Sequence, residues 1–208
     1  MEDTYPMTLR DKHEIAKRSI LDSARPLIGA RGFSAVGIAQ ILVAARIPKG
    51  SFYHYFDSKE RFGEDLLSLY IADYLATLEN LFSAPHQNGY EKIRAYLKFW
   101  RSTHIDGKVG DKCLIVKLAA EMADLSETMR EIMQCGTAKV IDRLTDVIQS
   151  GQKDGSINKE LQASTLAAAL YQTWLGATLM LKITKHTQPF DIAWQTSAHL
   201  LRGTPELL

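Results

Sequence analysis

The sequence has only two cysteines, Cys113 and Cys135, and they do not form a Cys-x-x-Cys pair. This scarcity excludes a disulfide-stapled scaffold and a cysteine-based zinc cluster, and it fits a reducing cytosol. The six histidines are scattered without ligand spacing. His13-Glu14 begins the zinc motif His-Glu-x-x-His, but Lys17 stands where the second histidine would be. We therefore expect no metal and no cofactor.

Long apolar runs are also missing. No run reaches the roughly 18–20 residues that a membrane-spanning helix needs. The charged stretch MEDTYPMTLRDKHE at the N-terminus carries no apolar region of a secretory signal. Phosphate-binding glycine loops and the Gly-x-Ser-x-Gly nucleophile motif are absent as well. We expect a cytoplasmic protein that has no membrane partner and is not an enzyme.

Strand signals are nearly absent, and apolar residues recur with helical periodicity instead. Ile15, Ile20, Leu21, Ala24 and Leu27-Ile28, for example, share one face of a first helix that Gly32 would end. The patterns predict an all-α fold of about nine helices, over residues 10–30, 37–45, 49–55, 61–82, 90–104, 111–122, 126–150, 159–184 and a last segment after Pro189.

Charge is distributed unevenly along the chain, although the formal net charge is only +1. Residues 1–63 carry ten Lys/Arg and seven Asp/Glu, whereas the remainder carries fifteen and seventeen. A basic N-terminal part on a mildly acidic remainder is a weak indication of a polyanionic partner.

Residues 46–62, RIPKGSFYHYFDSKERF, crowd basic and aromatic side chains around one glycine. Two short helices separated by a turn of about four residues, behind a longer helix, form the pattern of a helix-turn-helix. Backbone N–H groups at the start of the second short helix would face an anion, and a glycine there lets the backbone approach a phosphate. The candidate DNA contacts are Lys49, Gly50, Ser51, Tyr53, His54 and Lys59.

The aromatics of this stretch have an alternative interpretation, because rings at helical spacing more often belong to a core. Phe52 and Phe56 are four residues apart and share a face, so we expect them to pack inside. Tyr53 and His54 fall on the other side of the same helix. The stretch would then combine a buried face with a phosphate-facing edge.

The segment from Gly32 to Phe62, GFSAVGIAQILVAARIPKGSFYHYFDSKERF, resembles the DNA-binding head of TetR-type transcriptional repressors. The resemblance implies an all-α homodimer whose two heads read adjacent major grooves of a palindromic double-stranded operator. It also implies a division into a helix-turn-helix domain, residues 1–56, and a ligand-sensing and dimerisation domain, residues 57–208. In such families a small ligand bound in the second domain moves the heads apart.

Two positions depart from the pattern of that family. Gly37 stands where Ser or Thr is common at the cap of the first short helix, and Ala39 stands where many relatives place a polar base reader. Base readout is therefore expected to depend on Gln40, on Lys49 and on contacts with thymine methyl groups.

Cys113 lies in the segment GDKCLIVKLAAEMADLSETMR, residues 110–130, where Asp111 reads as the cap of a helix. A thiol in the first turn of a helix meets free N–H groups and the helix dipole, which favour the thiolate. Lys117 follows one turn later. The alternative is that Cys113 is a small buried hydrophobe, as most free cysteines are.

The same segment resembles a subgroup of TetR-type repressors that responds to electrophiles such as N-ethylmaleimide and acrylate. LYQTWLGATLMLKIT, residues 170–184, is similar as well, so the resemblance covers most of the chain. It implies that Cys113 is the sensing thiol and that the inducer is electrophilic. Lys182 would either stabilise the thiolate or react with an oxidised sulfur, or else it is a solvated lysine at a helix end.

Further residues are candidates for a pocket or for an interface between subunits. Tyr96, Trp100, His104, Met122 and Trp174 could line a ligand pocket, although each could equally be core. Residues 159–184 and 190–201 are the candidate dimer helices, with small residues that permit close approach: Ala167, Ala168, Ala169, Gly176 and Ala177. The alternative is an ordinary buried helix. We expect Cys135, in the middle of a helix, to be structural or incidental.

Three functions remain compatible with these residues. The first is a repressor released from DNA when an electrophile or oxidant modifies Cys113. The second is a repressor of the same type induced by noncovalent binding of a small molecule, with Cys113 inert. The third, a small thiol enzyme, has little support because no motif places a histidine or an acid beside Cys113.

Overall fold

The computed structural model describes residues 8–105 and 114–203, and in these ranges it contains nine helices and no strand. The prediction of an all-α fold is confirmed. The helices are α1 (Leu9–Arg31), α2 (Ile38–Ala45), α3 (Lys49–Tyr55), α4 (Lys59–Phe82), α5 (Gly89–Ile105), α6 (Leu114–Leu125), α7 (Glu127–Asp154), α8 (Ala163–Thr184) and α9 (Gln188–Arg202).

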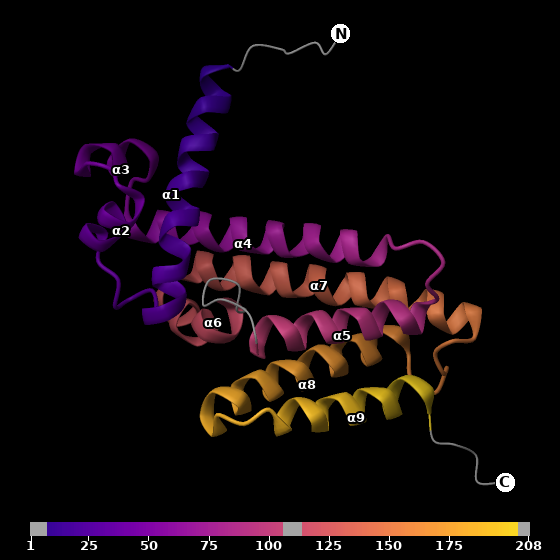
Figure 1. Cartoon of the computed structure of the whole chain (residues 1–208). Coiled ribbons are helices and arrows are strands. Elements are labelled where there is room, and N and C mark those ends of the chain that lie inside the picture. Colours follow the sequence, from indigo (N-terminus) through magenta and orange to yellow (C-terminus); the bar gives the residue numbers. More distant parts are fainter. Residues whose placement is uncertain (1–7, 106–113, 204–208) are drawn as a thin grey trace, which may run out of the picture.

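The helices form a small N-terminal unit on a larger bundle (Figure 1). We call α1–α3 the head and α5–α9 the body. The head gathers at one end of α4, and α4 runs along α7, which also packs against α5, α6 and α8. Because α9 packs on α8, these two helices form the side of the body that lies away from α4 (Figure 1). None of the helices in the described ranges has the length and hydropathy to cross a membrane.

Local capping signals explain why most helix ends fall where the sequence predicts them. Thr8 and Asp11 form a reciprocal capping box at the start of α1, and the Ser58 hydroxyl accepts the Arg61 N–H at 3.0 Å at the start of α4. Ser126 caps α7 in the same way through the Met129 N–H. Gly32, with a φ of 95°, ends α1.

Three helix boundaries differ most from the prediction, and side-chain hydrogen bonds explain the late start of α8. Helix α6 ends at Leu125 rather than at residue 122, and α7 continues to Asp154 rather than to 150. Helix α8 begins only at Ala163 rather than at 159. The amide of Gln152 donates to the carbonyls of Asn158 and Leu161, at 2.9 and 2.8 Å, and so holds the segment before α8 in a nonhelical path.

The buried side chains form two clusters rather than one. The first joins the head to the first half of α4, to α6 and to the start of α7; the second joins the rest of α4 to α5, α7, α8 and α9. Packing therefore does not divide at residue 56, and the predicted domain division remains a prediction. Ile15, which shares a face of α1 with the buried Ile20 and Leu21, is itself 56% exposed.

Candidate functional site

The turn between α2 and α3 is closed by the backbone itself. Arg46 adopts a left-handed conformation with a φ of 56° and ends α2, and the Ile47 N–H donates to the Leu42 carbonyl at 3.1 Å. Pro48, which has no N–H and cannot continue a helix, then caps α3. These features orient α3 relative to α2 as a helix-turn-helix.

The two faces of α3 divide as predicted. Phe52 and Phe56 are completely buried, and their rings pack against each other and against Phe62 with centroid distances of 5.0–5.7 Å. On the opposite side, Lys49, Gly50, Tyr53 and His54 are exposed, and Ser51 is half-buried beside them. We call these four exposed residues and Ser51 the α3 edge.

His54 is held by aromatic neighbours at the far end of α3. Its ring lies 5.4 Å from the ring of His13, on α1, and 5.0 Å from that of Tyr55. The His13 ring also contacts Tyr55 at 4.7 Å. Helix α1 thus supports α3 from the side that is not buried in the core.

The start of α3 differs from the expected row of free N–H groups. The Ser51 N–H donates to the Pro48 carbonyl at 3.0 Å, so it does not face outward as a donor for an anion. A helix of seven residues also has a small dipole, which makes side chains the main donors of this edge. A Cβ placed on Gly50 would meet no atom within 4 Å, so intramolecular packing does not require a glycine there.

Helix α2 presents a small apolar surface next to the α3 edge. Ala39 and Val43 lie four residues apart and are both exposed, Val43 by 78%. The side-chain oxygen of Gln40 accepts the Gly37 N–H at 3.0 Å, which is the glutamine half of a capping box. The amide N–H groups of Gln40 are the donors that it can offer to an external partner. Sequence reasoning missed Val43, although its position outside the apolar periodicity of α2 was a usable signal.

Lys59 does not lie along the α3 edge. Its ammonium group donates to the Ser34 carbonyl at 3.3 Å and lies 4.7 Å from the centre of the Phe33 ring. Burial lowers the pKa of this amine, and the nearby carboxylate of Glu121 opposes that shift. The contacts of Lys59 therefore connect α4 to the turn between α1 and α2, and the structure does not bring it together with Lys49 and Tyr53.

Part of the predicted sensor lies outside the described residues, namely Cys113. Lys117 belongs to the first turn of α6, and Lys182 lies half-buried in the last turn of α8.

Four of the five candidate pocket residues come together in the core of the body. Tyr96, Trp100, His104 and Trp174 are all buried. The Trp100 ring stacks on His104 with centroids 5.4 Å apart, and its indole N–H donates to the Thr178 hydroxyl at 2.9 Å. Met122 is also buried, but it belongs to the other cluster, next to the head.

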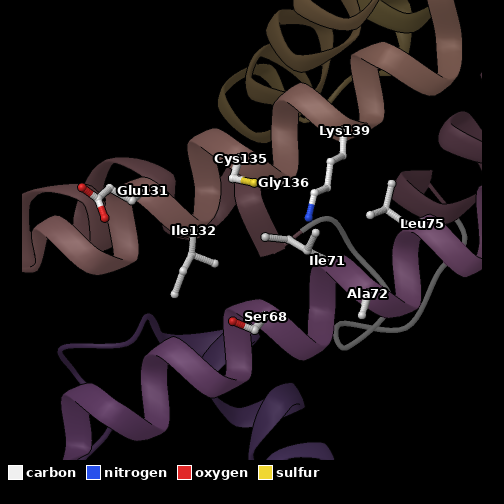
Figure 2. A pocket seen from close by; sticks show the side chains of 9 residues that line it. All are labelled: Ser68, Ile71, Ala72, Leu75, Glu131, Ile132, Cys135, Gly136 and Lys139. Carbon is white, nitrogen blue, oxygen red and sulfur yellow. The ribbon is translucent and has the colours of Figure 1, made fainter.

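Cys135 is exposed, and it lines an open groove of about 420 Å³ between α4 and α7. Figure 2 shows its sulfur atom near Gly136, with the charged groups of Glu131 and Lys139 on the same helix. The remaining lining residues are Ser68, Ile71, Ala72 and Leu75 of α4 and Ile132 of α7. Cys135 therefore fills no core position, contrary to a role in packing, and the groove that it lines is mainly apolar.

The outer side of α8 and α9 carries large apolar side chains in contact with solvent. Leu179, Met180 and Ile183 of α8 and Ile192 of α9 are between 44% and 64% exposed. By contrast, Ala167 and Ala177, expected at an interface, are buried in the protomer's own core. That expectation was wrong for these two residues, because the small side chains face the helices behind α8.

Comparisons with known proteins point to the same family for both parts of the chain. Residues 20–64 match the family described as bacterial regulatory proteins, tetR family, and residues 89–197 match the tetracyclin repressor-like C-terminal domain. The HTH-type transcriptional repressor NemR of Escherichia coli K12 is 34% identical over 187 residues, which cover 90% of this chain and 94% of that protein. The repressor DhaR of Mycobacterium sp. strain GP1 is 28% identical over 175 residues, covering 84% and 86%.

Solved structures show the same likeness in three dimensions. The reduced form of E. coli NemR superposes with a TM-score of 0.85 at 34% identity, covering 93% of this chain and all of that one. A TetR/AcrR-family regulator superposes with a TM-score of 0.80 at 41% identity, covering 90% and 98%. The chain therefore belongs to the TetR family of bacterial transcriptional repressors, and it is a regulator of transcription rather than an enzyme.

Proposed function

We propose that the protein is a homodimeric repressor that binds a palindromic operator through its two heads and releases it when an electrophile or oxidant modifies Cys113. The observation that carries the DNA-binding part is the α3 edge, where exposed polar side chains stand on a completely buried aromatic face. A recognition helix needs this division, because the buried face fixes the angle at which the edge enters the major groove.

The residues of the head take different roles in this proposal. Lys49 reaches a base edge or its adjacent phosphate, while Ser51, Tyr53 and His54 contact phosphates and set the register. Gly37 and Gly50 leave room for the DNA backbone, since a Cβ on either would meet no atom within 4 Å. Ala39 and Val43 face thymine methyl groups, and the amide N–H groups of Gln40 face a base acceptor. Lys59 supports the head indirectly, by its hydrogen bond to the turn between α1 and α2.

The exposed apolar surface of α8 and α9 supports a dimer. Met180 and Ile192 also line a groove between the two helices, so the surface is hollowed as well as apolar. A two-fold axis through it would place the same side chains of both copies against each other and would bury them all. The partner of this protein is therefore a second copy of its own chain, in addition to DNA.

The sensing part is supported by the likeness to NemR, whose solved form is described as reduced. That likeness extends over nine-tenths of the chain and includes the segment around Cys113. In our proposal, modification of Cys113 favours a body conformation in which the heads no longer match the operator. Such a shift requires that the modified and unmodified proteins differ in affinity for DNA. Since the partner is chromosomal DNA, we place this action in the cytoplasm.

The DNA-binding proposal is tested by Lys49→Ala combined with Tyr53→Ala, measured by gel shift on the DNA upstream of the gene. Losing two contacts per head should weaken binding by at least about 100-fold and should reduce its salt dependence. The oligomeric state and the melting temperature should stay the same, because both side chains are exposed. Unchanged affinity would refute the assignment of α3.

The sensing proposal is tested by treating the protein–DNA complex with N-ethylmaleimide or a quinone. We expect wild type and Cys135→Ser to release the DNA, and Cys113→Ser to bind it normally but stay bound. In Cys135→Ser, which removes the other exposed thiol, mass spectrometry should locate the adduct on Cys113. If Cys113→Ser releases DNA as wild type does, the thiol is not the sensor, and noncovalent induction becomes the better interpretation.

A further inference from the structure

A carboxylate from the body contacts the head far from the α3 edge. Glu121, on α6, accepts hydrogen bonds from the N–H groups of Phe33 and Ser34, at 3.2 and 2.5 Å. These two residues lie directly after the end of α1, in the turn that leads to α2. We call Gly32, Phe33 and Ser34 the 32–34 turn.

The backbone of the 32–34 turn explains why a carboxylate fits there. The Gly32 N–H still bonds to the Ile28 carbonyl, but the next two N–H groups lie past the end of α1 and point away from it. A Cβ on Gly32 would lie 3.1 Å from the Glu121 carboxylate, and its φ of 95° disfavours other residues. Glu121 thus accepts from two consecutive backbone donors beside the buried Phe33 ring.

Lys59 completes this contact from the other side. Its ammonium group donates to the Ser34 carbonyl, while the Glu121 carboxylate accepts the Ser34 N–H. One residue of the head is therefore hydrogen-bonded to both α4 and α6. Burial opposes ionisation of Glu121, but its hydrogen bonds from Ser34 and Phe33 and the charge of Lys59 outweigh burial and lower the pKa of Glu121. The carboxylate is therefore charged whenever the head is docked at neutral pH.

Outside this contact, ion pairs connect the head to α4, while apolar side chains pack it against α4, α6 and α7. Lys17 and Asp65 pair at 2.8 Å, and Arg18 and Arg25 both pair with Asp73, at 2.7 and 3.3 Å. These ion pairs connect α1 of the head to α4. Helix α6 packs mainly on α7 and also contacts α1 and α8, and through Glu121 it hydrogen-bonds to the backbone of the head.

We propose that Glu121 is a positioning residue that couples the orientation of the DNA-binding head to helix α6 through the 32–34 turn. Intact, the contact holds the two heads of a dimer at the spacing that the operator requires. A shift of α6 by one hydrogen-bond length would break both bonds and free the head to reorient with α4. The inference rests on the proposed function where it concerns dimers and release by an inducer.

The first experiment measures the spacing of the heads without DNA or inducer. A spin label on Ser19→Cys, an exposed site on α1, is placed in a Cys113→Ser/Cys135→Ser background, and distances within the dimer are measured by pulsed electron resonance. Glu121→Ala should broaden the distance distribution, and Glu121→Gln, which keeps one acceptor oxygen, should largely restore it. Asp124→Asn, an exposed carboxylate on the same helix, is the matched control and should match the parent.

The second experiment measures operator affinity with the native cysteines, before and after N-ethylmaleimide. Glu121→Ala should weaken binding of the untreated protein by about 10-fold and should reduce the further loss caused by the reagent by at least about 5-fold, as expected when a coupling is removed. Asp124→Asn should change neither value.

The outcomes separate the two proposals. If the head distances of Glu121→Ala equal those of Asp124→Asn, or if affinity falls while the response to the reagent keeps its full size, Glu121 is only structural and the inference is wrong. If wild type itself does not respond to N-ethylmaleimide, electrophile sensing fails, and the head distances alone decide on Glu121.

Discussion

Phe33, Gly63 and Met129 meet where the head rests on α4 and α7, and the contact leaves no spare volume. A Cβ on Gly63 would lie 2.6 Å from the Met129 methyl group and 2.6 Å from the Phe33 ring. Both neighbours are buried in the cluster that joins the head to α4, α6 and α7. At the scale of single residues, the position of the head therefore depends on close packing behind it as much as on the exposed side chains in front.

Gly63→Ala should lower the free energy of unfolding by about 1–3 kcal/mol, because an added methyl group in a filled site forces its neighbours to shift. Gly50→Ala is the comparison, since a Cβ there meets open space. We expect it to change stability by less than about 0.5 kcal/mol, while it weakens operator binding. Urea unfolding followed by circular dichroism measures the stabilities; equal values for the two variants would contradict the packing argument.

The pKa of Glu121 gives a second test at this scale. Because this pKa is lowered in the folded protein from its ordinary value of 4.5, the ionised group contributes stability above that pH. The contribution is lost as the pH falls through the folded pKa. Glu121→Gln should therefore have a lower free energy of unfolding than wild type at pH 7. The difference between the two proteins should narrow steadily below pH 4.5. A difference in free energy of unfolding that stays constant from pH 7 to pH 3 would be inconsistent with a charged Glu121.

At the scale of helices, hydroxyl caps set where two of the longest elements begin. Ser58 caps α4 and Ser126 caps α7, each by accepting the N–H three residues later. Helix α7 packs against α4, α5, α6 and α8. The Ser126 cap therefore stabilises a helix that contacts four others.

Ser126→Ala should destabilise the protein by about 1 kcal/mol, because the Met129 N–H loses its acceptor. Ser150→Ala changes an exposed serine within the same helix, where alanine is a better helix former. That control should be neutral or slightly more stable in thermal unfolding. If both variants melt together, the Ser126 hydroxyl has no capping role in solution.

At the scale of the whole molecule, the head and the outer side of α8 and α9 expose different kinds of side chain. The head presents polar side chains on the α3 edge, whereas α8 and α9 present Leu179, Met180, Ile183 and Ile192 to solvent. Reading two half-sites requires two heads at a set distance, and the apolar surface is suited to hold two copies together. The proposed DNA-binding surface and the proposed dimer interface therefore lie on separate parts of the chain.

Met180→Glu together with Ile183→Glu should weaken the dimer by at least about 100-fold, because a two-fold interface would bury four unpaired charges. Light scattering after gel filtration should then show a monomer, and operator affinity should fall with it. Leu9→Glu adds an acid at another exposed apolar position, outside the proposed interface, and should leave the dimer intact. A dimer that survives the double change would place the interface elsewhere.

The sequence by itself determined the nine helices of the described residues, the division of α3 into two faces and the resemblance to TetR-type heads. Periodicity, capping residues and glycine or proline stops act over a few residues, so they can be read directly from the chain. Only the tertiary structure decided that Lys59 turns toward Ser34, that Met122 lies apart from Trp100, and that Glu121 caps the 32–34 turn. Glu121 and Ser34 are 87 positions apart, and such a contact depends on how α6 packs against the head, which no local pattern encodes.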